Sequence, residues 1–512
     1  MLAKEIAASG VKTCFGIPGS GTTLDLLHHL EKLGVRIVIP SGEGAAAIMA
    51  GTSGRLSGSP GLAFSIRGPG VTNLVPGLAF CAWEALPMLA LTESVLTQDG
   101  TPSPHKYLDA VAVCRTITKA AIKNGNSTAA LSTALRTAAS ERPGPVLLQL
   151  EGPGAPDDDL PSGHLGPAQS RTTITPAQEK EIVRSAFPLV VAGSFVARAQ
   201  LGSLLSRLQV PVLTTPSGKG ATDERSPHSA GVFTGVDGAL TPASSLLNQA
   251  DLAIGIGVHS SELLALPSSK ETRWLFLGPS DLNVTDEDRE SKGISLTQLP
   301  RLLDGKDWGV ESIMSLKREL RMELLGRPFS PAHAYSQVQA ALGTKVRLVT
   351  DTGLFAILAE YLWETPATDQ FLGPTSSRTM GAGLPMAIAA ALHDRETPVV
   401  LAVGDGGIPQ YLADLRIAVR EQLPLLVVSM GDRTFGSIQR VVKKKSLRVT
   451  SLESQGEWRE IVRSFDIPVM KATGEGEVER TVSAWSPSSG PAFIDVSFDE
   501  SDYRASIDGL GQ

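Results

Sequence analysis

The chain has 512 residues, of which 42% are hydrophobic, and a formal net charge of −7 with a pI near 5.7. This length predicts about three domains of roughly 150 residues each, and the acidic balance argues against nucleic acid as the main partner because no broad basic face is implied. Three cysteines without paired spacing exclude a disulfide framework, and we expect a cytoplasmic protein because no leader and no apolar window of about 18 residues is present.

The first segment, up to about Leu150, alternates apolar strands with helices. Its predicted elements are the strand Val11–Phe15, a Gly/Pro turn over Gly16–Gly21, a helix capped by Thr22 or Thr23, the strand Val35–Ile39 and a small-residue helix over Ala45–Arg55. Glu43 stands between two glycines at the last strand-to-helix junction. Taken alone, it is a surface carboxylate favoured by the helix dipole.

Residues 151–176 are rich in Pro, Gly and charge, which is typical of an interdomain linker. The next segment has the alternation of a doubly wound domain. Its predicted elements are the strands Phe187–Ala192, Val210–Thr214 and Asp251–Ile256, the helix Ala197–Leu208 and a charged helical connector over Leu302–Arg327. The turn Gly255–Ser261 keeps only two glycines of a dinucleotide fingerprint, so we expect this central domain to bind no nucleotide.

The last segment, from about Pro331 to Gln512, begins with a strand over Arg347–Thr350 that ends at Asp351-Thr352-Gly353. The stretch from 398 to 436 then predicts a strand, a Gly-Asp-Gly turn, an amphipathic helix, a second strand over 425–430 and another polar turn. A strand over Pro491–Phe498 and a short tail from Ser501 close the chain. The basic run Lys443–Lys445 is expected to be a solvated face.

Asp405 and Asp432 follow the two strands of this βαβ unit and should therefore lie at one sheet edge. The glycines beside Asp405 let the backbone approach a ligand, and the helix N-terminus that follows favours a phosphate. Two carboxylates with the loop carbonyl of Thr434 form a hard oxygen site of the Mg²⁺ type, completed by diphosphate oxygens and water. The alternative is that Asp405 only caps a helix.

Together these motifs resemble thiamine diphosphate-dependent enzymes of the acetolactate synthase and 2-oxo acid decarboxylase family. Asp405 and Asp432 look like the family's diphosphate and metal signature, although the family usually has Asn-Asn at Gly431-Asp432. The other matching stretches are Glu43 with its Ala-rich helix, the turn Gly68–Asn73 (GPG-x-x-N), the domain-ending strand Arg142–Val146 and the run Ser376–Leu392 around Met380.

The resemblance implies an α/β fold of three doubly wound parallel-sheet domains: pyrimidine-binding (1–155), central (177–305) and diphosphate- and metal-binding (331–512). It makes Glu43 the residue that activates the cofactor and Met380 the wedge beneath it. The implied contacts to thiamine diphosphate are Glu43, Thr352, Gly353, Arg378, Met380, Asp405, Gly406, Gly407, Asp432, Thr434, Phe435 and Gly436, with Asp405, Asp432 and Thr434 holding Mg²⁺. Because Glu43 and Asp405 meet across a subunit interface in the family, a homodimer or homotetramer is expected.

Several positions depart from the acetolactate synthase pattern. Ser41-Gly42 replaces the His that often precedes the glutamate, and Leu354-Phe355 replace residues that touch the diphosphate. The SGEG form around Glu43 and the pair His105-Lys106 are closer to phosphonopyruvate and sulfopyruvate decarboxylases, so these two side chains are candidate contacts to an acidic substrate.

Three hypotheses stay open. The first is a decarboxylase of a small-molecule 2-oxo acid, with or without carboligation as in acetolactate synthase. The second is a decarboxylase of a phosphonate or sulfonate 2-oxo acid. The third is a catalytically silent cofactor-binding protein, against which the retained Glu43 argues. None of the three predicts a nucleic-acid or membrane partner.

Overall fold

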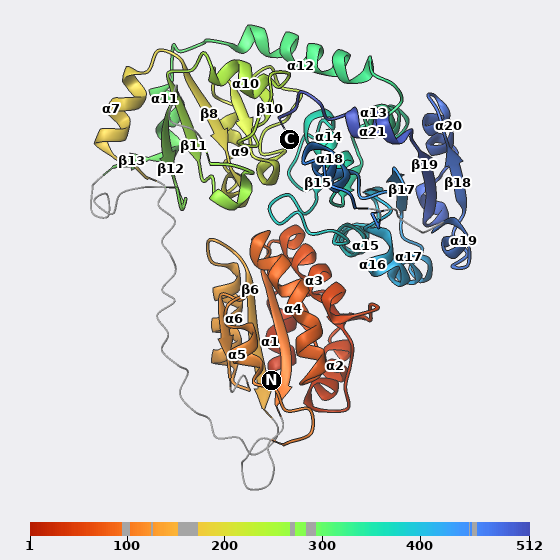
Figure 1. Cartoon of the computed structure of the whole chain (residues 1–512). Coiled ribbons are helices and arrows are strands. Elements are labelled where there is room, and N and C mark those ends of the chain that lie inside the picture. Colours follow the sequence, from red (N-terminus) through yellow and green to blue (C-terminus); the bar gives the residue numbers. More distant parts are fainter. Residues whose placement is uncertain are drawn as a thin grey trace. The chain divides into compact units, whose positions relative to one another are not determined.

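The structure is a computed structural model that describes residues 1–94, 103–123, 126–151, 173–266, 272–282, 293–449, 451–452 and 458–511. The chain forms two compact units, one of residues 1–169, 384–396 and 410–423 and the other of residues 170–383, 397–409 and 424–512. Three parallel sheets of six, five and six strands are their frameworks (Figure 1). The predicted α/β class with three doubly wound sheets is confirmed, whereas the predicted domain boundaries stay a prediction.

The first sheet lies in the first unit and has the strand order β2-β1-β3-β4-β6-β5. Its strands are β1 (Thr13–Gly16), β2 (Arg36–Val38), β3 (Gly61–Phe64), β4 (Met88–Ser94), β5 (Ala120–Ile122) and β6 (Pro145–Glu151). The helices between them are α1 (Leu2–Ala8), α2 (Thr22–Lys32), α3 (Glu43–Ser57), α4 (Pro69–Trp83), α5 (Ala110–Cys114) and α6 (Thr128–Ala139). Cys14, Cys81 and Cys114 are buried and free.

The predicted turn after β3 is in fact the start of a helix. Gly68 adopts a φ of 67° and Pro69 follows as the first residue of α4, an arrangement in which a left-handed glycine redirects the chain and proline fixes the first helical φ. Asn73 therefore lies one turn inside α4, and the motif places it on a helix rather than on a loop.

The central sheet has the order β10-β9-β8-β11-β12. Its strands are β8 (Pro188–Ala192), β9 (Val212–Thr214), β10 (Ser229–Val232), β11 (Leu252–Ile256) and β12 (Arg273–Leu277), and an antiparallel pair, β7 (Thr173–Ile174) with β13 (Ile294–Ser295), flanks the domain. Alternate residues of β8 enter two different hydrophobic clusters, Val190 in one and Leu189 and Val191 in the other. Both faces of the sheet are thus buried, as a doubly wound sheet requires.

The helices of this region are α7 (Pro176–Arg184), α8 (Ser194–Arg198), α9 (Gly202–Leu205), η1 (Pro216–Gly218), α10 (Pro242–Leu247), η2 (Ser260–Glu262), η4 (Leu296–Gln298), α11 (Leu299–Leu302) and α12 (Val310–Leu325). The single helix predicted over 197–208 is wrong, because Gln200 takes a φ of 54° and separates α8 from α9. The connector is confirmed as α12, and most of the linker predicted over 151–176 lies outside the described residues.

The third sheet has the order β15-β14-β16-β17-β19-β18. Its strands are β14 (Arg347–Thr350), β15 (Phe371–Leu372), β16 (Val399–Val403), β17 (Leu425–Gly431), β18 (Val469–Ala472) and β19 (Ala492–Ser497). The accompanying helices are α13 (Pro331–Leu342), α14 (Leu354–Leu362), α15 (Gly383–His393), α16 (Ile408–Tyr411), η5 (Leu412–Asp414), α17 (Leu415–Arg420), α18 (Gly436–Lys444), α19 (Trp458–Arg463), α20 (Glu477–Ser483), η6 (Pro487–Ser489) and α21 (Glu500–Ala505).

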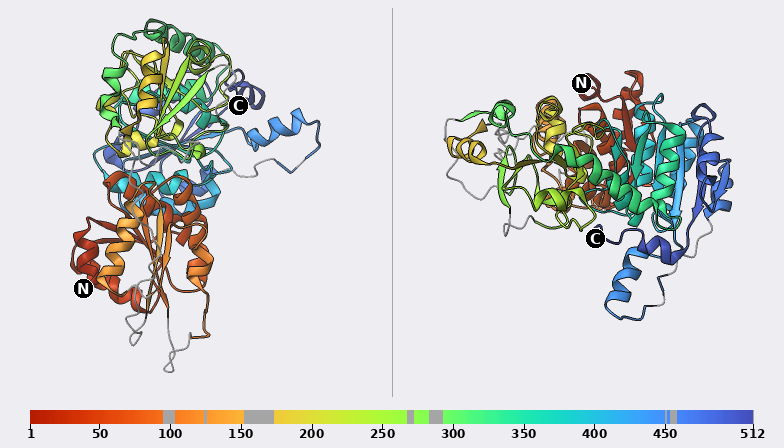
Figure 2. Two further views of the ribbon diagram at one scale, coloured as in Figure 1. Left: turned by 90° about the vertical axis from the view of Figure 1, so that its left-hand side faces the viewer. Right: turned by 90° about the horizontal axis from the view of Figure 1, so that it is seen from above.

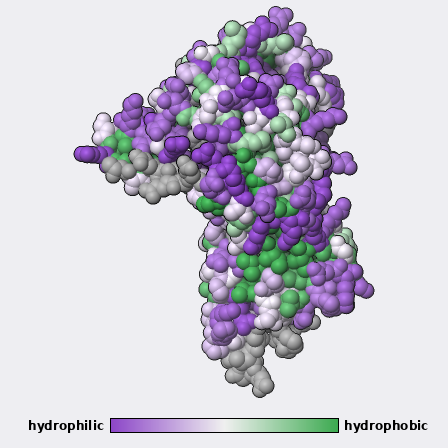
Figure 3. All heavy atoms as spheres, turned by 90° about the vertical axis from the view of Figure 1, so that its right-hand side faces the viewer, coloured by the Kyte–Doolittle hydropathy of each residue, from purple (hydrophilic) through white to green (hydrophobic). Residues whose placement is uncertain are grey.

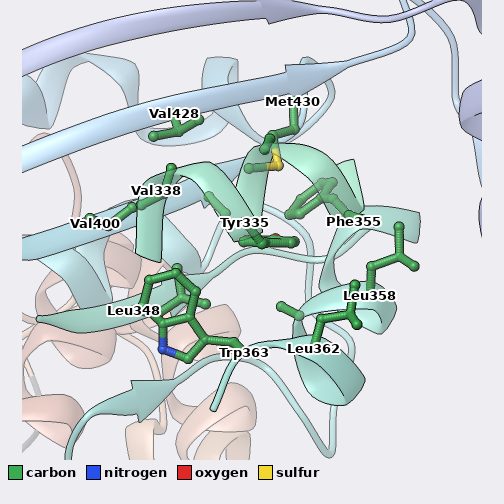
Figure 4. Packing of buried hydrophobic residues seen from close by; sticks show 14 of the residues in the cluster. Tyr335, Val338, Leu348, Phe355, Leu358, Leu362, Trp363, Val400, Val428 and Met430 are labelled. Carbon is green, nitrogen blue, oxygen red and sulfur yellow. The ribbon is translucent and has the colours of Figure 1, made fainter. Parts of the chain in front are cut away.

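The core of this domain lies between its sheet and the helices α13 and α14. Tyr335 and Trp363 meet edge to face, with ring centroids 6.2 Å apart, and Figure 4 shows them packed with Leu348, Val400 and other apolar side chains. Burial of each of these large side chains stabilises the folded domain by roughly 1.5–3 kcal/mol.

Two further predictions for the third domain are corrected. The amphipathic helix after the Gly-Asp-Gly turn is broken into α16, η5 and α17, since Tyr411 has the non-helical dihedrals φ −134° and ψ 25°. The closing tail contains the helix α21, which Asp499 caps by accepting hydrogen bonds from two backbone N–H groups. Lys443–Lys445 lie at the end of α18, which projects from the domain (Figure 2), and all three lysines are exposed, as predicted.

A buried ionic network joins the central and third domains within the second unit. The Lys219 ammonium donates to both carboxylate oxygens of Glu224 at 2.7 Å and to the backbone carbonyl of Glu360 at 2.9 Å. Glu224 also accepts the backbone N–H of Thr365 at 2.9 Å. Buried charges need such partners, so these two domains are fixed to each other.

No helix among the described residues has the length and apolar character needed to cross a membrane.

Candidate active site

Glu43 is the first residue of α3 and only 5% exposed. Its Oε2 accepts a hydrogen bond from Asn73 Nδ2 of α4 at 3.2 Å, and a Cβ added to Gly70 would lie 3.2 Å from its Oε1. The carboxylate is thus held by the first turn of a neighbouring helix. The predicted residues Glu43 and Asn73, which are 30 positions apart, are brought together.

Close packing of α3 on α4 sets this geometry. Eleven of the fifteen residues of α3 are buried, most of them Ala or Gly. A Cβ on Gly77 would lie 2.4 Å from the Gly44 carbonyl oxygen and 2.6 Å from Ala47 Cβ, and one on Gly51 would lie 2.5 Å from Cys81 Sγ. Such distances are below any real contact, so the glycines permit the approach that places Glu43 beside Asn73.

A second carboxyl group supports the loop before Glu43. Asp414 Oδ1 accepts the backbone N–H of Ser41 at 2.5 Å, while its Oδ2 is buried without a hydrogen-bond partner among the described residues. Burial raises the pKa of Asp414 to about 6, although the Ser41 contact opposes the shift. This residue was not predicted, because its partner is more than 370 residues away in the sequence.

In the second unit, three aspartates follow three adjacent strands of the third sheet. Asp351 follows β14, Asp405 lies just beyond β16 and Asp432 follows β17, and the three strands pair in parallel with β16 in the middle. Their carboxyl ends therefore share one edge, which is where open α/β sheets bind ligands.

Asp432 lies close enough to Asp405 to raise the pKa of the Asp405 carboxyl group. The pKa of Asp405 is raised to about 6, first by burial and then by the neighbouring Asp432 carboxylate. Burial also raises the pKa of Asp432, whose two oxygens accept from the N–H and the hydroxyl of Thr434 at 3.3 and 3.1 Å. A cation between the two carboxylates would relieve this repulsion.

In the described part of the chain, no three His, Cys, Asp or Glu side chains converge on a metal-sized site. The two carboxylates would therefore hold a cation only together with ligands of another kind. Mg²⁺ suits this donor set because it is commonly bound by one or two carboxylates plus phosphate oxygens and water.

Met380 and Phe435 both lie against Gly406. A Cβ on Gly406 would be 2.8 Å from the Phe435 ring and 3.1 Å from Met380 Sδ. Three predicted cofactor contacts are thus assembled at the turn after β16, where only a glycine leaves room for them.

Asp351 is a buried residue that sequence reasoning did not select. Its carboxylate accepts the N–H groups of Gly381 at 2.8 Å and of Gly383 at 3.2 Å, and a Cβ on Gly407 would lie 1.8 Å from its Oδ2. Burial raises its pKa to about 6, whereas these N–H groups lower it. Asp351 therefore positions the turn that carries Met380.

The remaining predicted residues are placed in different ways. Thr352 Oγ1 is buried and has no partner among the described residues, as expected of a group that awaits a ligand. Arg378 instead forms a bidentate pair with the buried Glu360, at 2.5 and 3.2 Å. Leu354 and Phe355 belong to the hydrophobic core, with the Phe355 ring filling the space beside Gly353.

A cavity of about 290 Å³ lies beside Asp405 and Asp432. Its lining includes Arg433, Trp458 and Arg459, none of which the sequence pattern had indicated. The polar side chains that line this cavity come from separate strands and helices. No local sequence motif could therefore have predicted that they lie together.

His105 and Lys106 are exposed residues of the first unit. Lys106 has a φ of 58°, and its backbone carbonyl would lie 2.6 Å from a Cβ on Gly68. The predicted pair thus lies over the loop that leads from β3 to α4, with Arg67 beside it.

Comparison with known families agrees with this geometry. Residues 1–113 match the N-terminal TPP binding domain of thiamine pyrophosphate enzymes, residues 179–275 match their central domain, and residues 351–496 match their C-terminal TPP binding domain. The chain belongs to the thiamine pyrophosphate enzymes, and thiamine diphosphate is the cofactor of its two TPP binding domains.

Individual relatives indicate the group of thiamine pyrophosphate enzymes that the chain resembles. The chain is 26% identical to a probable 2-ketoarginine decarboxylase of Pseudomonas aeruginosa, over 97% of this chain and 93% of that protein. It is 25% identical to the acetolactate synthase isozyme 2 large subunit of Escherichia coli and 27% identical to the catabolic acetolactate synthase of Raoultella terrigena, with at least 94% of each relative covered. The protein is thus an enzyme of the acetolactate synthase and 2-oxo acid decarboxylase group.

Proposed function

We propose that this enzyme decarboxylates a 2-oxo acid with thiamine diphosphate and Mg²⁺, with or without a following carboligation. The observation that carries the proposal is the buried Glu43 carboxylate, held by Asn73 at the N-terminus of α3. Bound thiamine diphosphate would supply the carbon nucleophile and the electron sink that let CO₂ leave.

The edge of the third sheet would hold the diphosphate end of the cofactor. Asp405 and Asp432 would share Mg²⁺ with the Thr434 carbonyl, and the unpartnered Thr352 hydroxyl would contact the cofactor. Gly353, Gly406, Gly407 and Gly436 would offer their backbones to the cofactor, and a Cβ at each would lie within 3 Å of Phe355, Phe435, Asp351 and Asp432, respectively. Met380 and Phe435 line the turn at Gly406. Arg378, the other predicted contact, would have to reach the cofactor while it stays paired with Glu360.

Glu43 would control one proton. Its Oε2 is engaged by Asn73, whereas its Oε1 faces Gly70, which has no side chain to block it. A carboxyl group so placed can share its proton with a ring nitrogen of the cofactor and so favour loss of the C2 proton.

Association into a homodimer or homotetramer is part of the proposal. Helix α4 carries half-buried or exposed apolar residues at helical spacing: Val75, Pro76, Ala79 and Trp83. Trp83 is 52% exposed. Figure 3 shows hydrophobic side chains gathered on one face of the molecule. Apolar surface of this kind is typical of protein interfaces, and sedimentation of the purified chain would measure the oligomeric state.

The test follows exchange of the cofactor C2 proton for deuterium, by NMR after acid quench. Glu43→Gln keeps the size of the side chain and an oxygen for Asn73 but cannot supply the proton, so we expect exchange to slow by about 10²–10⁴ with cofactor affinity nearly unchanged. Glu31→Gln makes the same change at an exposed residue of the same unit and should leave exchange unaltered.

Equal exchange rates in the wild-type enzyme and Glu43→Gln would contradict the role of Glu43. Wild-type exchange no faster than that of free cofactor would instead favour a catalytically silent cofactor-binding protein.

A second candidate is decarboxylation of a phosphonate or sulfonate 2-oxo acid. It is favoured by the position of the basic residues His105 and Lys106 over the β3–α4 loop. A panel of 2-oxo acids, with CO₂ release and product mass measured, distinguishes the two candidates.

A further inference from the structure

Arg67 lies at the carboxyl edge of the first sheet. It follows β3, which pairs in parallel with β4, and Glu93 is the last but one residue of β4. The Arg67 guanidinium lies with Nη1 3.7 Å from Glu93 Oε1, and its Nε–H donates to the backbone carbonyl of His105 at 3.3 Å. These two contacts fix the orientation of the guanidinium.

Glu93 is buried and is held by Thr23 and Arg67. Its Oε2 accepts both the N–H and the hydroxyl of Thr23 at 3.1 Å, its Oε1 faces Arg67, and its side chain is only 3% exposed. A Cβ on Gly21 would lie 2.5 Å from each oxygen, so the backbone of the β1–α2 loop closes over the carboxylate. The buried acid serves to hold Thr23 and Arg67.

Arg67, by contrast, keeps donors free. Its side chain is 24% exposed, and within the described residues its only hydrogen bond uses Nε. The two terminal nitrogens carry four N–H donors, and a guanidinium presents them in a fork that matches the oxygens of a carboxylate, phosphonate or sulfonate. Glu93 balances the charge of Arg67, but the terminal N–H groups that do not face Glu93 are left to bind an anion.

The same loop contacts the catalytic carboxylate. Gly70 would place a Cβ 3.2 Å from Glu43 Oε1 and 3.0 Å from Ile66 Cγ1. Arg67 thus belongs to the short segment between Ile66 and Gly70 that lines Glu43, and Lys106 packs its backbone on Gly68 within it. A ligand beside Glu43 would lie on the loop that carries Arg67.

We propose that Arg67 determines substrate specificity by binding a second acidic group, one that the 2-oxo acid keeps after CO₂ has left. This inference rests on the proposed function. A cation on the departing carboxylate would stabilise the ground state more than the transition state and would oppose decarboxylation. A cation that binds an acidic group retained by the substrate stabilises the ground state and the transition state equally. It therefore raises selectivity without slowing decarboxylation.

The test compares phosphonopyruvate and sulfopyruvate with pyruvate and 2-ketoarginine, whose far end carries a methyl group and a cation respectively. The wild-type enzyme should have the highest kcat/KM for the two acids with a second acidic group. Arg67→Gln should lower kcat/KM for them roughly 10- to 100-fold, the effect of losing a charge-assisted contact, and change the pyruvate value less than about threefold. Arg115→Gln, at an exposed residue of the same unit, removes the same charge and should change neither.

A measurement without turnover separates this inference from the proposed function. Calorimetry with phosphonoacetate, which has no keto group, should give a Kd at least about tenfold weaker for Arg67→Gln than for the wild-type holoenzyme, and an intermediate value for Arg67→Lys. Arg67→Gln leaves the buried Glu93 carboxylate without its cation, which could prevent folding. In that case the double variant Arg67→Gln/Glu93→Gln removes both charges and should show the same loss of phosphonoacetate affinity.

Equal phosphonoacetate affinity in the wild type and the variants would overturn the inference, as would a wild-type preference for pyruvate or 2-ketoarginine. Failure of the wild type to accelerate C2 exchange would overturn the proposed function, while the phosphonoacetate affinities would still decide the role of Arg67.

Discussion

Replacing Gly77 with alanine should show how firmly α4 holds Glu43. The added methyl group would lie 2.4 Å from the Gly44 carbonyl oxygen and 2.6 Å from Ala47 Cβ. Both neighbours belong to the buried face of α3, and one of them is a backbone atom that no rotamer change can move away. The two helices would have to separate by about 1 Å to restore normal contact distances.

The expected cost follows from two opposing terms. Alanine in a helix interior is favoured over glycine by about 1 kcal/mol, whereas overpacking of a rigid contact costs roughly 1–3 kcal/mol or more. With a backbone oxygen in the contact we expect the upper end of that range, and thus a net loss of about 2 kcal/mol. For a unit of this size, this loss lowers the Tm by roughly 4–8 °C.

The assay combines thermal unfolding with C2 proton exchange of the bound cofactor. Gly77→Ala should lower the first unfolding transition and also slow exchange, since the shift of α3 moves Glu43 relative to Asn73. Gly474→Ala is the control, because a Cβ there meets nothing within 4 Å. An unchanged Tm and exchange rate in Gly77→Ala would refute the close packing of α3 on α4.

Three further predictions concern charged groups. Asp405→Ala and Asp432→Ala should each abolish thiamine diphosphate and Mg²⁺ binding in calorimetry, and an unchanged cofactor affinity in either would contradict their role as joint ligands. Because burial raises the pKa of Asp414 from 3.8 to about 6, its contribution to stability is present below pH 3.8 and is lost as the pH rises through 6. The unfolding free energy of Asp414→Asn, relative to that of the wild type, should therefore rise by about 2 kcal/mol between pH 4 and pH 7. A difference that does not change with pH would count against the raised pKa. Lys219→Met should cost roughly 3–5 kcal/mol in urea unfolding, since it leaves Glu224 buried without a cation, and Lys219→Met/Glu224→Gln should recover most of that loss.

Much of the fold could be predicted because its signals are local. Apolar runs such as Val399–Val403 mark buried parallel strands, and glycines beside Asp405 mark the turn that follows. The approximate positions of Glu43, Asp405 and Asp432 at the ends of strands follow from the same alternation. Helix continuity was harder to predict, since Tyr411 interrupts a pattern that is periodic enough for one helix.

Long-range partners could not be predicted. The hydrogen bond from Asn73 to Glu43 and the pairing of Arg67 with Glu93 depend on which strands become neighbours. No periodicity within a window of 20 residues contains that information. Asp351 was missed for another reason, because its partners are backbone N–H groups, which every residue possesses.

The ionic network between the central and third domains bears on the exchange of domains between relatives. Lys219 and Glu224 come from the central domain, while the Glu360 carbonyl and the Thr365 N–H that complete their coordination come from the third. A chimera that takes its central domain from a relative would leave these backbone groups facing side chains of another length or charge. Recombination is therefore expected to succeed where the donor carries a lysine and a glutamate at these two positions, and to fail where it carries only one of them.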